Sequence, residues 1–364
     1  MPGIYKHSHF KSDIWGHGGN KRTAQINHLL LNAGLTFTEA DFSAYAPAAK
    51  NILHYFKGLS FSGNISNGFK NNYAIGRYLK QFEAFIKQHR PDYFIWESTN
   101  AFNLLLAGVL HNFQIPFVAL PHNIESLVQG SESIFSQKTS PHWLTEELSY
   151  LKHANHVFTI SREEQWLLAT HHIEASYLPY YPPAELKNSL LNIRDKRIEY
   201  KTNDQQRKKQ LLLLGTFYNA PTYNGYMRLI NQIKHLNNIE INVVGSGSEQ
   251  LRKIFPQENI KIWGTVSTAQ LHELLITCHQ ALVHQEPTSG ALTRIPELLL
   301  AGVPILANTV AARSYYDLNG ITIYHDTDQL IDLINMETKP MPPLVPQPIE
   351  EEYFIKYIVA NARQ

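Results

Sequence analysis

The sequence predicts an α/β protein with two doubly wound domains that face each other across a cleft. Short apolar runs alternate with amphipathic stretches along the whole chain, which is the pattern of parallel sheets covered by helices. The chain has 364 residues, too many for one ordinary core and suited to two domains of roughly 150–200 residues. Hydrophobic residues make up 43% of the chain and charged residues 17%, a balance typical of globular proteins.

Each half of the chain repeats the strand–helix alternation. In the first half the expected strands cover 4–7, 93–97, 116–119, 156–160 and 175–178, and the expected helices cover 21–32, 73–88, 102–112, 144–153 and 163–171. In the second half the expected strands cover 210–214, 240–244, 260–263, 280–284 and 304–307, and the expected helices cover 225–234, 249–254, 269–277 and 293–301. Such units cross over right-handedly and build open parallel sheets with helices on both faces.

Two breaks divide the pattern into domains. Tyr180–Pro183 forms a stiff connector, and the strongly polar segment 194–209 follows it as an expected linker. A proline-rich stretch at 339–348 then precedes a last amphipathic helix at 350–361. The predicted domains are therefore 1–180 together with the C-terminal helix 350–364, and 181–349. Ligands of such sheets bind outside the carboxyl ends of the strands.

Charge and composition exclude several classes of partner. Lys and Arg total 32 against 31 Asp and Glu, so a formal net charge of +1 draws the protein neither to nucleic acid nor to a membrane. No apolar stretch approaches the ~18 residues of a transmembrane segment, and the N-terminus lacks the apolar core of a signal peptide. Cys278 is the single cysteine, so a cytoplasmic location is expected.

The segment from His284 to Glu297 is the most informative part of the sequence. A strand ends near His284, and a glycine loop at 289–292 leads into a helix that begins close to Thr293, because Pro296 is tolerated only in a first turn. Free backbone N–H groups at such a start suit a diphosphate, and Arg294 adds a bidentate contact. Glu297 lies one turn deeper, where it can bind ribose hydroxyls. Alternatively, Glu297 only favours the helix dipole and pairs with Arg294.

These residues resemble a known family. The stretch 297–304 looks like the Glu-x-x-x-x-Gly-x-Pro signature of the family 4 glycosyltransferases, which have the GT-B fold, with Glu297 on the acid assigned to the donor ribose. The family's first acid falls on Ser289, so this chain is closer to a variant with Gly-x-x-x-Arg/Lys-Ile-x-Glu. Glu286 is a candidate replacement for the missing carboxylate.

The resemblance extends to other turns. Gly215 and the Val-Gly-x-Gly turn with Gly245 and Gly247 resemble the family's donor-side glycines, although 216–219 lacks its usual basic pair. Thr265 and Val266 resemble its turn beside the base. In the first half, the stretch 16–22 resembles its N-terminal glycine loop, and 121–126 resembles its His-Asn-x-Glu-Ser element, whose histidine is His122 here.

The resemblance implies a glycosyltransferase that uses a UDP- or GDP-sugar, retains anomeric configuration and needs no metal or other cofactor. It implies catalytic roles for His122, Arg294 and Glu286, and an acceptor side at Gly18, Gly19 and Arg22; the acceptor itself stays unknown. Donor contacts are expected from Gly215, Gly245, Gly247, Thr265, Val266, Ser289, Gly290, Ala291, Leu292, Arg294 and Glu297. The alternatives are a nucleotide-sugar epimerase on the same fold, and a catalytically degenerate binding protein.

Other signals carry less weight. Asp326 and Asp328 match an Asp-x-Asp metal motif, but Asp328 stands where a helix cap is expected. The histidines lack the spacing of a helical zinc site. Glu125 and Glu163 are either acceptor contacts or helix-start carboxylates. For His122 the simpler alternative is a hydrogen-bonded core histidine.

Overall fold

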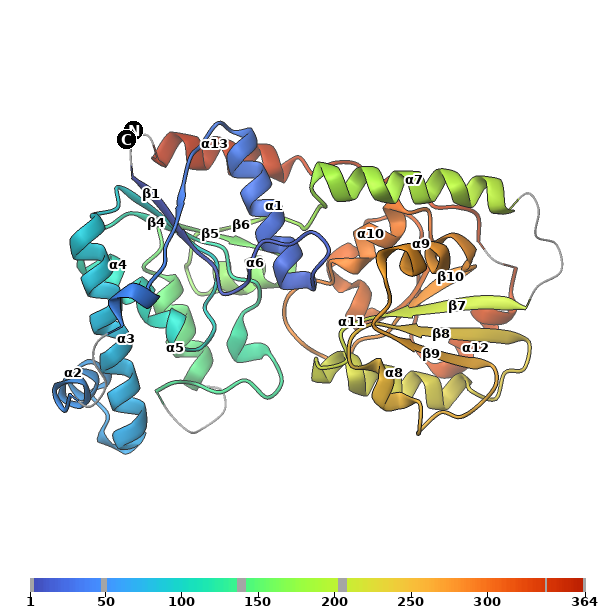
Figure 1. Cartoon of the computed structure of the whole chain (residues 1–364), viewed down its shortest axis with the longest axis horizontal. Helices are drawn as coiled ribbons and strands as arrows, with labels where there is room; N and C mark the ends of the chain where they lie inside the picture. Colours follow the sequence, from blue (N-terminus) through green and yellow to red (C-terminus); the bar gives the residue numbers. More distant parts are fainter. Residues whose placement is uncertain (1–2, 47–50, 136–141, 202–207, 338, 363–364) are drawn as a thin grey trace.

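The computed structural model shows two α/β domains side by side along the long axis of the molecule (Figure 1). The structure describes residues 3–46, 51–135, 142–201, 208–337 and 339–362. Within these ranges each domain holds one parallel sheet of six strands, in the order β2-β1-β3-β4-β5-β6 and β12-β11-β10-β7-β8-β9. The predicted pair of doubly wound domains is therefore confirmed.

The N-terminal sheet is formed by residues up to Tyr177. Its strands are β1 (Ile4–His7), β2 (Thr38–Glu39), β3 (Tyr93–Trp96), β4 (Phe117–Ala119), β5 (His156–Thr159) and β6 (Ala175–Tyr177). The helices between them are α1 (Gly18–Asn32), α2 (Leu53–Ser62), α3 (Gly68–His89), α4 (Leu104–Asn112), α5 (His142–Leu151) and α6 (Arg162–Thr170). Short 3-10 turns precede α3 and α4 and follow β4, including η2 (Ile65–Asn67) and η4 (Glu125–Leu127).

The C-terminal sheet follows a long helix, α7 (Ala184–Lys201). Its strands are β7 (Lys209–Leu214), β8 (Ile239–Val244), β9 (Ile260–Gly264), β10 (Gln280–Val283), β11 (Ile305–Asn308) and β12 (Ile321–Tyr324). The other helices are α8 (Ala220–Ile233), α9 (Thr268–Thr277), α10 (Arg294–Leu300), α11 (Thr309–Ala312), α12 (Thr327–Asn335) and α13 (Glu350–Ala362), with the 3-10 turn η5 at Ser248–Leu251.

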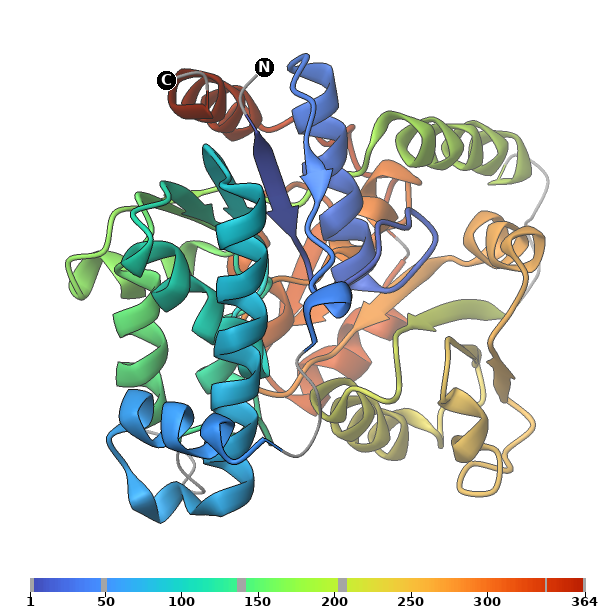
Figure 2. The same cartoon turned by 60° about the vertical axis from the view of Figure 1, so that its left-hand side comes forward.

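Each sheet is buried between two layers of helices. In the N-terminal domain, α3, α4 and α5 cover one face, and α1 and α13 lie side by side on the other, where Phe354 and Ile358 join Ile4 and Ile26 in one cluster (Figures 1 and 2). The last helix thus returns to the first domain. The chain passes between the domains twice, at Tyr180–Pro183 and in the stretch before Glu350. These two segments are in contact, because Tyr181 Oη donates a hydrogen bond of 3.3 Å to the carbonyl of Val345.

The observed elements depart from the sequence prediction at several points. The expected polar linker at 194–209 is wrong over 194–201, because these residues complete α7, which buries Leu186, Leu190 and Ile193 along one face. The helix expected at 249–254 is only the 3-10 turn η5. The cap of α12 is Asp326 and not Asp328, since Asp326 Oδ1 accepts the Gln329 N–H at 2.8 Å.

Helix α2 was not predicted either. It packs against α3 so closely that a Cβ on Gly58 would lie 1.7 Å from the carbonyl oxygen of Asn72, and one on Gly76 would lie 1.8 Å from that of His54. The two helices therefore form a hairpin with backbone contact, which projects from the N-terminal domain away from the other domain (Figures 1 and 2).

Candidate functional site

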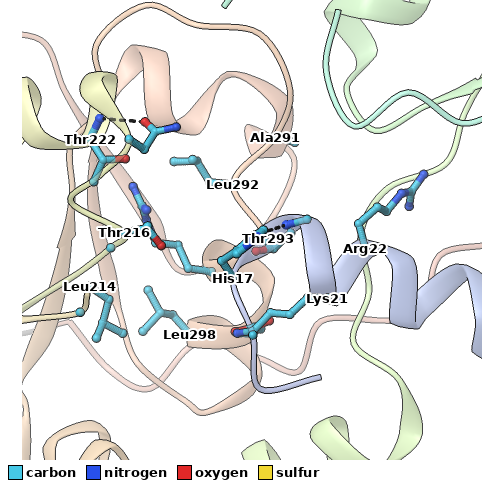
Figure 3. A pocket seen from close by; sticks show the side chains of 18 of the residues that line it. His17, Lys21, Arg22, Leu214, Thr216, Thr222, Ala291, Leu292, Thr293 and Leu298 are labelled. Carbon is cyan, nitrogen blue, oxygen red and sulfur yellow. Dashed lines mark hydrogen bonds and ion pairs between the residues drawn. The ribbon is translucent and has the colours of Figure 1, made fainter. Parts of the chain in front are cut away.

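A cleft of about 640 Å³ lies between the two domains, at the carboxyl ends of both sheets. Loops that follow β1, β4, β7, β8, β9 and β10 all contribute to its walls. Figure 3 shows Lys21 and Arg22 of α1, with its N-cap residue His17, at one side and Leu214, Thr216, Thr222 and Leu298 of the C-terminal domain at the other. This is the location that doubly wound sheets offer to ligands.

Two glycines allow the turns after β7 and β8 to meet at the cleft. Gly245 has a φ of +131°, and a Cβ there would lie 1.8 Å from the carbonyl oxygen of Gly215. Both residues line the cleft, so backbone rather than side chain faces a ligand here. Gly247 lies beyond the cleft wall, where a Cβ would meet the Tyr218 ring at 3.2 Å.

The turn after β9 adds Thr265 and Val266 to the same wall. The Thr265 N–H donates a hydrogen bond of 2.8 Å to Glu249 Oε1, which fixes the turn from outside. Val266 packs with Leu271 in the apolar cluster beside α9. The base side predicted from the sequence is therefore a mixed surface of backbone and aliphatic side chains.

Arg294 is held at the start of α10, as the position of Pro296 requires. Its Nη2 donates to Gln285 Oε1 at 3.2 Å, and its guanidinium lies 5.8 Å from the centre of the Tyr226 ring. In the part of the chain that the structure describes, its buried Nε has no hydrogen-bond partner. Arg294 does not pair with Glu297, so it keeps donor capacity at the cleft wall.

Glu297 is engaged by the other domain. Its Oε2 lies 2.6 Å from the Lys21 Nζ on α1, and its Oε1 accepts a hydrogen bond of 2.8 Å from the Tyr180 hydroxyl. Burial, with Glu297 as the next cause, raises the pKa of Tyr180. The carboxylate therefore lies in the cleft but already has a cation and a hydroxyl as partners.

The loop before α10 is also bridged to the N-terminal domain. Glu164 Oε1 accepts the Gly290 N–H at 2.9 Å, the Ser289 hydroxyl at 3.1 Å and the Ile124 N–H at 2.9 Å. Gly290 has a φ of +77°, and a Cβ there would lie 2.1 Å from Asn123 Oδ1. Ser289, Ala291 and Leu292 line the cleft, while Gly290 lies behind them.

His122 lies at the end of a buried charged array. Its Nε2 is 3.4 Å from Glu97 Oε2, and Glu97 also binds the Lys6 ammonium at 2.8 Å and the Thr23 hydroxyl at 2.8 Å. Burial opposes ionisation of Glu97, but the charge of Lys6 and the hydrogen bonds from His122 and Lys6 together outweigh it and hold the pKa of Glu97 well below its ordinary value. Burial lowers the pKa of His122, so its imidazole is neutral at pH 7.

The residues predicted for the acceptor side, Gly18, Gly19 and Arg22, lie in the first turns of α1. His17 Nδ1 accepts the Gly19 N–H and caps the helix, which therefore begins at Gly18, three residues before the predicted start. A Cβ on Gly18 would lie 3.2 Å from the Thr293 Oγ1 of the other domain. Arg22 is buried and donates to Gln25 and to the Pro179 carbonyl, and burial lowers its pKa to about 10.

Glu286 does not join this site. It lies on the outer side of the 285–293 loop, 3.1 Å from Arg228, and lines a separate small hollow with Tyr223 and Met227. A compensating or catalytic role for Glu286 therefore has no support in this geometry. Every other predicted site residue except Gly247 and Gly290 lines the cleft.

Comparison with solved structures identifies the architecture. Sucrose-phosphate synthase from Thermosynechococcus elongatus superposes with a TM-score of 0.60 at 12% identity, covering 100% of this chain and 91% of that one. The UDP-GlcNAc 2-epimerase of Methanocaldococcus jannaschii, in complex with UDP-GlcNAc and UDP, gives 0.53 at 13% identity, covering 99% and 100%. WaaG, a glycosyltransferase involved in lipopolysaccharide biosynthesis, gives 0.56 at 12%, covering 99% and 94%.

This chain has the GT-B fold. No protein-family model matches the sequence, and no curated protein matches it either. The likeness therefore lies in the GT-B architecture over essentially the full chain.

Several residues at this cleft were not predicted from the sequence. Glu297 binds Lys21 and Tyr180, and the Gly290 N–H binds Glu164 of the N-terminal domain. Glu97, which pairs with Lys6, contacts His122. One signal was available: a lysine inside the apolar strand at 4–7 requires a buried carboxylate partner. Among the described residues, no group of three His, Cys, Asp or Glu side chains could hold a metal ion, and no helix is long and apolar enough to cross a membrane.

Proposed function

We propose that this protein is a glycosyltransferase that moves a sugar from a UDP- or GDP-sugar to an acceptor. The observation that carries the proposal is the single cleft that joins Arg294 and Glu297 of the C-terminal domain to His122 of the N-terminal domain. Donor-binding and reaction-side groups on opposite walls are what a two-substrate transfer needs. Two structural neighbours, a glycosyltransferase and an epimerase in complex with UDP-GlcNAc and UDP, support the same substrate class.

In this proposal the C-terminal domain binds the donor. The diphosphate lies against the turns at Gly215 and Gly245, where backbone replaces side chains, and receives charge-assisted hydrogen bonds from Arg294. The base lies at Thr265 and Val266, and the ribose hydroxyls bind Glu297. Arg294 supplies positive charge to the departing diphosphate, so we propose that no metal takes part. Transfer that is lost in EDTA and restored by manganese would contradict this part.

Donor binding requires an exchange of partners. Lys21 occupies one oxygen of Glu297, and Glu164 occupies the Gly290 N–H that was expected to face phosphate. We propose that the ribose displaces Lys21 from Glu297 and that the loop at 289–290 either stays with Glu164 or changes partner when the domains separate. Lys21 is then left beside the diphosphate, where a cation is favourable.

The proposed reaction takes place at the wall that the N-terminal domain forms. The bond between the anomeric carbon and the diphosphate oxygen breaks, a bond to an acceptor hydroxyl forms, and the hydroxyl proton leaves with the diphosphate. His122, neutral and oriented by Glu97, positions the sugar, and the acceptor lies against the start of α1 at Gly18, Gly19 and Arg22. Retention of configuration is the outcome that the family resemblance implies.

A thermal-shift screen against UDP, GDP and ADP tests the donor half of the proposal. A nucleotide at 100 times its dissociation constant stabilises a fold by about 2.7 kcal/mol, so the correct base is readily recognised. Radiolabelled donor with candidate acceptors then tests transfer. A chain that no nucleoside diphosphate stabilises would contradict the proposal.

A nucleotide-sugar epimerase is the second candidate, because the M. jannaschii epimerase superposes over 99% of this chain and 100% of its own. An epimerase returns an altered sugar nucleotide without acceptor, whereas a transferase without acceptor releases at most slow hydrolysis products. Chromatography of the donor after incubation with the purified chain separates them. Nucleotide binding without either product would leave the third alternative, a catalytically degenerate binding protein.

A further inference from the structure

The α2–α3 hairpin carries exposed apolar side chains at its tip. Ile52 is 53% exposed, Leu53 58%, Phe56 56%, Ile65 73% and Phe69 58%, and they come from the start of α2, from η2 and from the start of α3. We call these five residues the hairpin tip. Large apolar side chains gathered on one projecting element mark an interaction surface.

The tip is ordered by aromatic packing beneath it. The Tyr55 ring stacks on Phe69 with centroids 4.8 Å apart, and Phe69 in turn stacks on Tyr73 at 6.0 Å. The backbone contact at Gly58 and Gly76 fixes the two helices against each other. The apolar side chains are therefore held outward by a rigid support and do not fold back into the core.

The sequence between Asp41 and Glu83 is basic, although Lys57 within it pairs with Glu83. Between Asp41 and Glu83 the sequence contains no acidic residue, and its Lys and Arg residues are Lys50, Lys57, Lys70, Arg77 and Lys80. The stretch thus carries +5, which leaves 1 − 5 = −4 for the rest of the chain. The overall charge of +1 hides this segregation. Lys70 and Arg77 are exposed seven residues apart, on one face of α3.

We propose that the hairpin tip docks the protein on an anionic lipid bilayer. Exposed Leu, Ile and Phe side chains flanked by Lys and Arg are what an interfacial membrane anchor presents, with the apolar groups below the headgroups and the cations among them. The tip is narrow and projects from the domain (Figures 1 and 2). That shape suits a planar surface better than a protein partner, which needs roughly 800 Å² on each side.

The position of the hairpin also links docking to the cleft. Phe61 on α2 packs against Phe135 at 6.4 Å, and Phe135 belongs to the segment after β4 that also contains His122. A bilayer at the tip therefore lies on the acceptor-side domain and leaves the C-terminal domain free. The proposal concerns membrane binding itself and stands whether or not the protein transfers sugar.

Vesicle flotation of the full chain tests the proposal. We expect binding to phosphatidylcholine vesicles that contain phosphatidylglycerol, weaker binding to phosphatidylcholine alone, and release in high salt. Lys70→Glu should weaken binding at least about fivefold, the effect of one cation near such a surface. The double variant Leu53→Ser and Phe56→Ser should weaken it more than about tenfold.

Matched variants away from the hairpin serve as controls. Leu31→Ser removes a leucine that is 60% exposed on α1, and Lys253→Glu reverses an exposed charge in the C-terminal domain. Both should bind vesicles like the wild type, and thermal unfolding should show that all variants fold. A wild-type chain that ignores anionic vesicles overturns the proposal. So do tip variants that bind as the controls do, or tip variants that change only self-association.

Discussion

Glu297 is the residue whose partners define the donor side of the cleft. Its two oxygens bind Lys21 and Tyr180, so it is a preorganised acceptor that a ribose can share or take over. We predict that Glu297→Gln weakens UDP or GDP binding by about 1.5–3 kcal/mol, the scale of a hydrogen bond to a charged group. Isothermal calorimetry measures the change.

The control for this prediction is Glu286→Gln, which removes the same charge from the same loop region outside the cleft. The Glu286 carboxylate pairs with Arg228 on the outer surface, and the nucleotide affinity of the variant should stay within about 0.5 kcal/mol of the wild type. Equal affinities for wild type and Glu297→Gln would remove Glu297 from the donor site.

His122 lies on the opposite wall of the cleft, and its substitution tests the role proposed for that wall. We predict that His122→Ala keeps nucleotide affinity within about 1 kcal/mol but reduces turnover at least about tenfold, because the proposed function places His122 against the reacting sugar and not against the nucleotide. Its neutral state is maintained by burial, so the pH dependence of turnover above pH 7 should not follow its titration. Parallel losses of binding and turnover would put His122 in the nucleotide pocket.

Motif spacing alone predicted that Arg294 and Glu297 share one wall, because residues three apart lie on one helical face. It could not predict their partners. Lys21 and Glu297 are 276 residues apart, and Gly290 and Glu164 are 126 apart, so their contacts arise only when the two domains are assembled. The same holds for Glu286, whose side of the loop depends on how the turn before Gly290 bends.

At the scale of elements, the loop that carries His122 is fixed by acidic side chains of two helices. Glu147 on α5 accepts the Glu125 and Ser126 N–H groups at 2.9 and 2.8 Å, and Glu164 on α6 accepts the Ile124 N–H. Burial and then the nearby Glu147 charge raise the pKa of Glu125 to about 7, and burial raises the pKa of Glu147 and Glu164 as well.

This cluster predicts a pH dependence of stability. The folded chain holds a proton on Glu125 more tightly than the unfolded chain does, so protonation stabilises the fold. That stabilisation is complete below the ordinary carboxyl pKa of 4.5 and is lost as the pH rises through about 7. Between pH 5 and 8, Glu125 should therefore contribute a fall of about 1–3 kcal/mol in the free energy of unfolding. This contribution is measured as the difference between the wild type and Glu125→Gln, because buried histidines such as His122, whose pKa is lowered, contribute in the opposite direction.

Denaturant unfolding at several pH values measures this dependence. Glu132→Gln is the matched control, because Glu132 is exposed on the same loop region and its loss should leave the slope unchanged. A Glu125→Gln variant with the wild-type slope would contradict the assignment of the titration to this cluster.

Elements differ in how much of them the sequence determines. The parallel strands are buried on both faces, so they appear as short apolar runs, and most were predicted to within one or two residues. Helix α7 was missed because its last turns are polar, although Leu186, Leu190, Ile193 and Arg197 follow one helical face. Arg197 is buried there against the carbonyls of Gly302 and Ile276, a tertiary contact that no local pattern indicates.

At the scale of the whole molecule, ion pairs and hydrogen bonds hold the two domains together. Besides Lys21 and Glu297, Arg162 binds Asp317 at 2.9 Å, and the Ser314 hydroxyl donates to Glu163 at 2.8 Å. Only two covalent crossings join the sheets, at Tyr180–Pro183 and before Glu350. Alternation of strands and helices predicted both domains, but their relative orientation depends on these contacts between distant segments.

The last prediction concerns opening of the cleft. In the proposed function the ribose displaces Lys21 from Glu297, so we expect the two domains to separate before binding and to close again over the donor. Two partly exposed ion pairs contribute about 1–2 kcal/mol together, so Lys21→Ala with Arg162→Ala should raise the open population and the nucleotide on-rate about five- to thirtyfold. X-ray scattering should show a larger radius of gyration without nucleotide and a return toward the wild-type value with UDP or GDP. Lys57→Ala removes the Lys57–Glu83 pair within the N-terminal domain and should change neither quantity. If the double variant scatters and binds like the wild type, the domains are held by other contacts, and entry to the cleft does not depend on these two pairs.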